Sequence, residues 1–169
     1  MFQHFGAKDI CHTKKETAPW IGIDYGATVT IHMVKIYNRQ DCSGCTQRTK
    51  NVHVHISDEL PTSSEKMFSG GTFLGRFYGP ATTGQIIRIS GRKYQSLLIQ
   101  NIQGNAPASG RYVVIQIYNR GAQSILNFAE VQAFGNVIVI LTSQELRMLS
   151  SVTLDCQVTK IVMNSGSQL

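Results

Sequence analysis

The chain has 169 residues, of which 42% are hydrophobic and 15% are charged, as in an ordinary globular protein of one domain. Lysine and arginine number 16 against 10 acidic residues, and the net charge of +6 favours anionic partners such as nucleic acid, sulfated glycans or anionic lipid. No nucleic-acid-binding motif is present, and no apolar run approaches the roughly 20 residues of a membrane span. We therefore expect neither a nucleic-acid partner nor a transmembrane segment.

The first residues, MFQHFGAKDICHT, lack the charged start and the apolar core of a signal peptide. The protein is therefore either cytosolic or exported by a segment that this chain does not contain. Four cysteines, Cys11, Cys42, Cys45 and Cys156, allow three pairings if all of them are oxidised. Cysteine usage alone leaves the compartment open.

Strand patterns recur at short intervals, with turn residues between them. Residues 20–24 alternate between apolar and polar, and Gly26 is predicted to end that strand. The clearest alternation is at 52–57, where His53 and His55 are predicted to form the solvent face of a strand. Other strands are predicted at 29–37, 72–78, 85–89, 96–102, 111–119 and 126–134.

The connections between these strands are short and rich in glycine, proline, serine and asparagine. They are too short for the crossover helices of a parallel sheet. The pattern therefore predicts an all-β fold, an antiparallel β-sandwich of jelly-roll type, with one domain at 1–135. Residues 136–169 form an atypical C-terminal extension that contains an apolar run at 137–141, and it is either an added strand or a loosely packed tail.

The pair Cys42-Ser43-Gly44-Cys45 suits three kinds of site. A redox centre would start a helix, but a strand pattern follows this pair. A zinc site would need two more ligands, and no second Cys or His pair has the usual spacing. A small local disulfide would shape a surface loop. No Ser-His-Asp arrangement and no carboxylate pair can be picked out, so we expect a protein that is not an enzyme.

Four further side chains, His12, Arg39, Asp41 and Arg48, lie near these cysteines in sequence. Arginine offers several N–H donors in a rigid fork, and neutral histidine can donate one hydrogen bond and accept another. Asp41 can pair with an arginine and hold its rotamer. The set suits a polyhydroxylated or anionic small ligand, and the alternative interpretation is a set of ordinary loop charges.

At these residues the sequence resembles the F-type lectin (fucolectin) family. The matching segments cover most of residues 5–135, and the pattern of a histidine, Arg-x-Asp and a further basic residue is the most specific part. The segments are HTKKETAPW at 12–20, NRQDC at 38–42, CTQR at 45–48, GRYVVIQI at 110–117 and AEVQAFG at 129–135.

The resemblance implies a discoidin-like, galactose-binding-like jelly roll that binds L-fucose without chemistry. It implies that His12, Arg39 and Arg48 contact the sugar, and we include Asp41 in the predicted sugar-binding set. The implied partners are fucosylated glycans or glycoproteins. The implied setting is an extracellular, secreted lectin of innate immunity or cell adhesion, acting as a homo-oligomer or as part of a multi-domain lectin so that weak sites add up.

The sequence departs from the family pattern in three ways. The family's two adjacent cysteines are here separated by two residues, and we predict that Cys42 and Cys45 form a disulfide at the rim of the site. The calcium loop that precedes the histidine in the family is missing, which leaves Glu130 as the remaining candidate metal ligand. The family's other cysteines are absent, so that Cys11 has only Cys156 as a distant partner. These departures suggest a partial or alternatively spliced domain.

Two other classes of function are compatible with the sequence. A discoidin-like adhesion module would bind protein, sulfated glycan or anionic lipid through its positive rim. A redox or metal protein would use the Cys42–Cys45 pair, with bound zinc or a reactive thiol.

Overall fold

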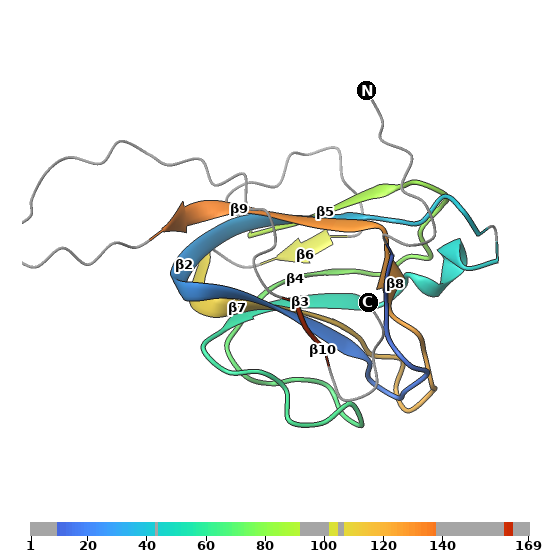
Figure 1. Ribbon diagram of the computed structural model, residues 1–169, viewed down its shortest axis with the longest axis horizontal. Coiled ribbons are helices and arrows are strands. Elements are labelled where there is room, and N and C mark those ends of the chain that lie inside the picture. The colour runs from blue at the N-terminus through green and yellow to red at the C-terminus, as the bar shows by residue number, and fades with distance from the viewer. Residues whose placement is uncertain (1–9, 43, 92–101, 105–106, 138–160, 164–169) are drawn as a thin grey trace, which may run out of the picture.

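The computed structural model describes residues 10–42, 44–91, 102–104, 107–137 and 161–163, and it confirms the antiparallel β-sandwich (Figure 1). Strand pairing is antiparallel at every described ladder. The elements are β1 (Cys11–His12), β2 (Trp20–Tyr37), the 3-10 helix η2 (Thr46–Arg48), β3 (Val52–Ser57), β4 (Thr72–Phe77), β5 (Ile86–Ser90), β6 (Ile102–Gly104), β7 (Ala108–Ile117), β8 (Asn127–Phe128), β9 (Glu130–Val137) and β10 (Ile161–Met163).

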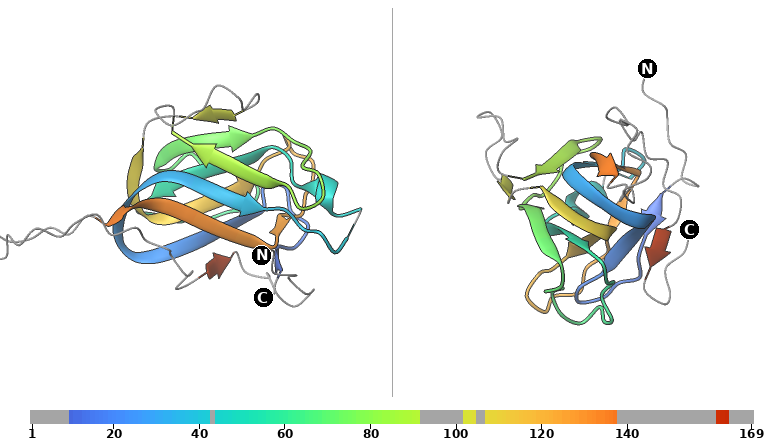
Figure 2. Two further views of the ribbon diagram at one scale, coloured as in Figure 1. Left: turned by 90° about the horizontal axis from the view of Figure 1, so that it is seen from above. Right: turned by 90° about the vertical axis from the view of Figure 1, so that its left-hand side faces the viewer.

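Strand β2 takes part in both layers of the sandwich. Its first part pairs with β7 in the order β2-β7-β3-β4-β6, and its second part lies between β5 and β9. Figure 1 shows β2 turning at the left of the view, from the layer of β7 and β3 to the layer of β9 and β5. The views in Figure 2 show the same turn from above and from one end.

The prediction that Gly26 ends a strand is wrong, because β2 continues through it for 18 residues. The register against β7 shifts between Asp24 and Val29, which marks a bulge rather than an end. Gly26 adopts φ 72°, a left-handed conformation that favours glycine, and its N–H donates to Asp24 Oδ1 at 2.8 Å. The bulge lets the strand bend from one layer into the other.

The core lies between the two layers and is built mainly from β-branched residues. Alternate residues of β2, β3 and β7 face inward, as the period of two in the sequence predicts. The largest fully buried apolar side chains are Ile21, Ile23, Ile36, Ile56, Leu74, Ile87, Ile89, Ile115, Ile117, Leu126 and Phe128.

The outer face of β3 is buried, which contradicts the prediction that His53 and His55 face solvent. Their exposed fractions are 5% and 4%. The connection between β3 and β4 folds back over this face, where Phe68 packs edge-on to His55 with 5.5 Å between ring centroids. Gln116 of β7 holds that connection, because its amide accepts from Phe68 N at 2.7 Å and donates to Lys66 O at 3.2 Å.

The predicted strand at 96–102 lies largely outside the described residues, and so does most of the C-terminal extension. In the C-terminal extension, β10 pairs with Ile21, Gly22 and Ile23 of β2, which supports the added-strand interpretation for these three residues. The domain boundary at residue 135 stays a prediction. In the described ranges, no helix has the length and apolarity needed to cross a lipid bilayer.

Candidate binding site

Three segments that are distant in sequence meet at one end of the sandwich. The short strand β1 pairs with β8, which sets His12 opposite Asn127. The chain after β2 forms the loop that contains the two cysteines and the 3-10 helix, at the same end of the molecule as β8 (Figure 1). This end holds all four residues of the predicted sugar-binding set.

Asn38 fixes the loop from beneath. Its side chain is 1% exposed, and its amide donates to Thr46 O at 3.1 Å and to Thr82 O at 2.8 Å. Its carbonyl oxygen accepts from Thr49 Oγ1 at 2.8 Å, and that hydroxyl also lies 3.3 Å from Asn127 O. One buried amide therefore connects the end of β2, the 3-10 helix and the strand opposite His12.

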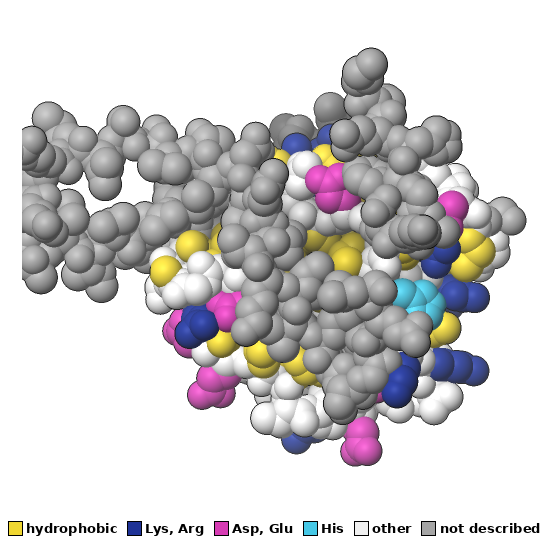
Figure 3. Space-filling model, viewed as in Figure 1, with side chains coloured by type: hydrophobic (Ala, Val, Ile, Leu, Met, Phe, Trp, Pro, Cys, Tyr) yellow, Lys and Arg dark blue, Asp and Glu magenta, His cyan; other side chains and the backbone are white. Residues whose placement is uncertain are grey.

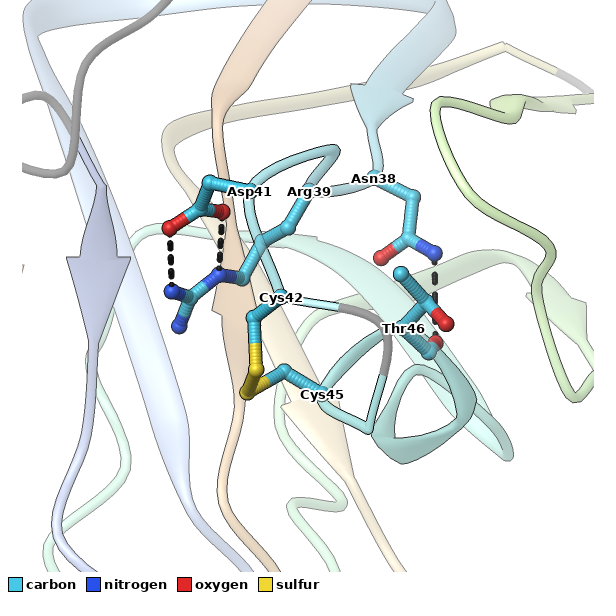
Figure 4. The surroundings of a disulfide bond; sticks show 6 residues. All are labelled: Asn38, Arg39, Asp41, Cys42, Cys45 and Thr46. Atoms are coloured by element: carbon cyan, nitrogen blue, oxygen red, sulfur yellow. Dashed lines mark hydrogen bonds and ion pairs between the residues drawn. A yellow bond between two sulfur atoms is a disulfide. The ribbon is translucent and has the colours of Figure 1, made fainter.

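Arg39 and Asp41, which belong to the same loop, form an ion pair through two hydrogen bonds (Figure 4). Arg39 Nε donates to Asp41 Oδ1 at 2.9 Å, and Nη2 donates to Oδ2 at 2.7 Å. The prediction that Asp41 pairs with an arginine is confirmed. Among the described residues these bonds use two of the five guanidinium N–H groups, so that the other three can bind a ligand. The pair lowers the pKa of Asp41, mainly through the hydrogen bond from Arg39.

The predicted bond between Cys42 and Cys45 is present. Their sulfur atoms are joined in a disulfide, and the backbone N–H of Cys45 donates to Cys42 O at 3.1 Å. Figure 4 shows the disulfide beside the Arg39 side chain, while Asn38 points away from it toward Thr46. While this disulfide is intact, neither sulfur can act as a thiolate ligand for zinc.

His12 lies within the electrostatic reach of both arginines. Burial lowers the pKa of its imidazole, and the charges of Arg39 and Arg48 lower it further. The ring is therefore largely neutral at pH 7 and can donate one hydrogen bond and accept another. Figure 3 shows a histidine and several Lys or Arg side chains gathered at this end of the molecule. The group is polar, cationic and partly open to solvent.

Glu130 lies at the start of β9, opposite Tyr37. It accepts a hydrogen bond from Gln132 Nε2 at 2.6 Å, and Gln132 in turn accepts from the Tyr37 hydroxyl at 2.9 Å. Within the part of the chain that the structure describes, no group of three His, Cys, Asp or Glu side chains could hold a metal ion. Calcium takes 6–8 oxygen ligands, so the described surroundings of Glu130 do not fit it.

We predict that calcium does not stabilise this protein. Adding calcium in excess should leave the melting temperature unchanged within about 1 °C, because a ligand raises stability only by binding the folded state. Differential scanning fluorimetry with calcium, and with magnesium as the control, makes the comparison. A rise of several degrees with calcium alone would contradict the prediction and show that other oxygen ligands form a site.

Cys11 is a half-buried free thiol, and burial raises its pKa. Its predicted distant partner, Cys156, lies outside the described residues. Sequence reasoning missed Asn38 and Thr49, which support the loop without being candidates for ligand contact. The only indication in the sequence was a polar residue directly after a β-branched and aromatic strand.

The sequence is similar to one known family of domains and to part of one larger protein. Residues 6–115 match the family of NedA-like, galactose-binding domains. A pentraxin fusion protein from Xenopus laevis is 29% identical over 132 residues, which are 78% of this chain and 26% of that protein. The chain thus spans about a quarter of the length of this relative.

Two solved structures match most of this chain, and the first of them is similar in fold. A fucolectin from striped bass (Morone saxatilis) serum has 23% identity and a TM-score of 0.58, over 76% of this chain and 36% of that chain. A fucose-binding module from Streptococcus pneumoniae has 20% identity and a TM-score of 0.46, over 73% of this chain and 68% of that chain.

Proposed function

The chain belongs to the family of NedA-like, galactose-binding domains, and on that premise we propose that it is a lectin that binds L-fucose and fucosylated glycans. It acts by binding and not by catalysis. The observation that carries the proposal is the convergence of a neutral histidine and two arginines at one end of the sandwich. Neutral sugars are recognised by such fixed donors and acceptors.

Each residue has a distinct role in this proposal. His12 exchanges hydrogen bonds with sugar hydroxyl or ring oxygens as a neutral imidazole. Arg39 donates its remaining N–H groups, and Asp41 holds the guanidinium in one orientation. Arg48 donates from the end of the 3-10 helix η2.

We further propose that the protein works outside the cell and through several linked sites. A local disulfide is the kind of bond that persists in an oxidising compartment. A single small sugar offers few atoms, so we expect a dissociation constant between millimolar and tens of micromolar. Effective binding to a glycoprotein then requires a homo-oligomer or further domains.

A glycan array followed by calorimetry with free L-fucose tests the proposal. We expect signals for fucose-terminated glycans that change little between low and high salt, because hydrogen bonds to a neutral sugar are only weakly screened. Binding that does not depend on fucose, and that disappears as the salt concentration is raised, would overturn the proposal. That result would identify a discoidin-like adhesion module that binds anionic surfaces.

The disulfide gives a separate prediction. Cys42→Ser combined with Cys45→Ser should weaken L-fucose binding severalfold, because the loop that carries Arg48 must then be ordered on binding. The melting temperature should hardly change, because so short a ring restricts the unfolded chain only slightly. Calorimetry and thermal melts measure the two effects. Mild reductant should reproduce the loss in the parent and have no effect on the double variant, and undiminished binding would contradict the prediction.

A further inference from the structure

A groove of about 720 Å³ adjoins the proposed fucose site. Arg48 lines it together with Lys15 and Lys50, and the amides of Gln47 and Gln123 also face it. No carboxylate is among its lining residues in the described ranges. The volume lies within the roughly 300–1,000 Å³ of ligand pockets. The groove is therefore large enough for a ligand, and its charge has one sign.

The walls of the groove are joined to one another. Glu16 and Ser124 exchange backbone hydrogen bonds of 2.9 and 2.6 Å, which connects the segment of Lys15 to the loop before β8. Asn51 Nδ2 donates to Asn119 Oδ1 at 2.6 Å, which connects the segment of Lys50 to the same loop. These bonds hold the walls of the groove in place, so that little ordering is required when a ligand binds.

No carboxylate among the described residues forms an ion pair with these three cations. The ion pairs between described residues join Arg39 to Asp41 and Arg111 to Asp24, and neither involves Lys15, Arg48 or Lys50. All three side chains are exposed. Like charges around one hollow create a positive potential that a bound anion relieves. An uncharged ligand would gain no binding energy from this positive potential.

We propose that this groove is a subsite for an anionic sugar residue, carrying a sulfate ester or a carboxylate, that is linked to the fucose in the first site. The proposal rests on the proposed function, and it specifies which fucosylated glycans are preferred. Arg48 connects the two sites. Its charge lowers the pKa of His12 in the first site, and its side chain lines the groove. Lys15 and Lys50 bind the anionic group, and the two glutamine amides contact the neighbouring hydroxyls.

Calorimetry with four probes tests the subsite: L-fucose, the Lewis a trisaccharide, and the sulfated and sialylated forms of that trisaccharide. We expect the better of the two anionic forms to bind about 5- to 10-fold more tightly than the neutral trisaccharide, the range of one or two exposed charge contacts. Tighter binding of the sulfated form would identify a sulfate as the preferred anionic group, and tighter binding of the sialylated form would identify a carboxylate. The preference should shrink as salt is raised from about 50 to 500 mM.

The double variant Lys15→Gln with Lys50→Gln should reduce this preference to less than about 2-fold and leave L-fucose affinity unchanged. The control is Lys14→Gln with Lys66→Gln, which removes two exposed lysines outside the groove and should keep the preference. Equal binding of neutral and anionic trisaccharides by the parent would overturn the proposal, and so would a preference that survives in the groove variant.

Failure of the first site is distinguishable from failure of the groove. If L-fucose does not bind, the proposed function is wrong, and galactose 3-sulfate then probes the groove alone. Binding of that sugar by the parent but not by the groove variant supports an anionic-sugar site. No binding of it, in a protein that also ignores fucose, overturns the groove proposal as well.

Discussion

Arg39→Ala is expected to weaken L-fucose binding by about 10- to 150-fold, or about 1.5–3 kcal/mol, the range of hydrogen bonds to a charged group. The guanidinium is already oriented by two hydrogen bonds to Asp41, at 2.9 and 2.7 Å. Its remaining donors can therefore bind a sugar without ordering a flexible side chain first. Calorimetric titration of L-fucose into the parent and the variant measures the loss.

Two companion variants separate contact from orientation. Asp41→Asn keeps the size of the side chain but weakens the ion pair, so we expect a smaller loss than for Arg39→Ala. Arg88→Ala removes an exposed arginine of β5 and should bind like the parent. Equal affinity of the parent and Arg39→Ala would show that Arg39 is outside the site. A loss as large in Arg88→Ala would show that net charge, and not position, controls binding.

The segments that carry the candidate site were recognisable from the sequence because short local patterns specify them. The spacing of Arg39 and Asp41 places both side chains on one loop, where they pair as predicted. Cys42 and Cys45 are also close in sequence, so that their bond needs no long-range information. The approach of His12 to this loop depends on the pairing of β1 with β8, more than a hundred residues apart, and only the family resemblance indicated it.

Two errors have the same physical origin. The alternation at β3 correctly predicts which side chains face the core. It does not predict whether another segment covers the opposite face of the strand. The connection after β3 covers that face because Gln116 of β7 binds its backbone, a contact between residues 48 apart in sequence. The sequence around Gly26 is ambiguous in the same way, because glycine both ends strands and forms bulges. In each case the neighbouring strand, and not the local sequence, decided the outcome.

The burial of the outer face predicts that acid destabilises this protein through His53. The ring is 5% exposed, and burial lowers its pKa from 6.5 to about 4, with Arg76 and His55 adding to the shift. Arg76 is opposite His53 in the register of β4, and its guanidinium lies over the Tyr78 ring at 4.3 Å. On β7 the opposite residue is Gln116, which is uncharged. Protonated His53 would therefore face a second cation, and no carboxylate is opposite it in either register.

The sign follows from linkage. Because the pKa is lower in the folded state, the unfolded state binds more protons below pH 6.5, and stability is lost as the pH falls from 6.5 through about 4. The loss is about 2 kcal/mol at pH 5 and about 3 kcal/mol at pH 4. Urea unfolding at pH 7, 5 and 4 should therefore show a steep fall in the parent and a shallower one in His53→Gln. His32→Gln, at a half-buried histidine of β2, is the matched control and should fall like the parent. If His53→Gln loses as much stability as the parent, the proton enters elsewhere, and the buried outer face of β3 is not the acid-sensitive part of the fold.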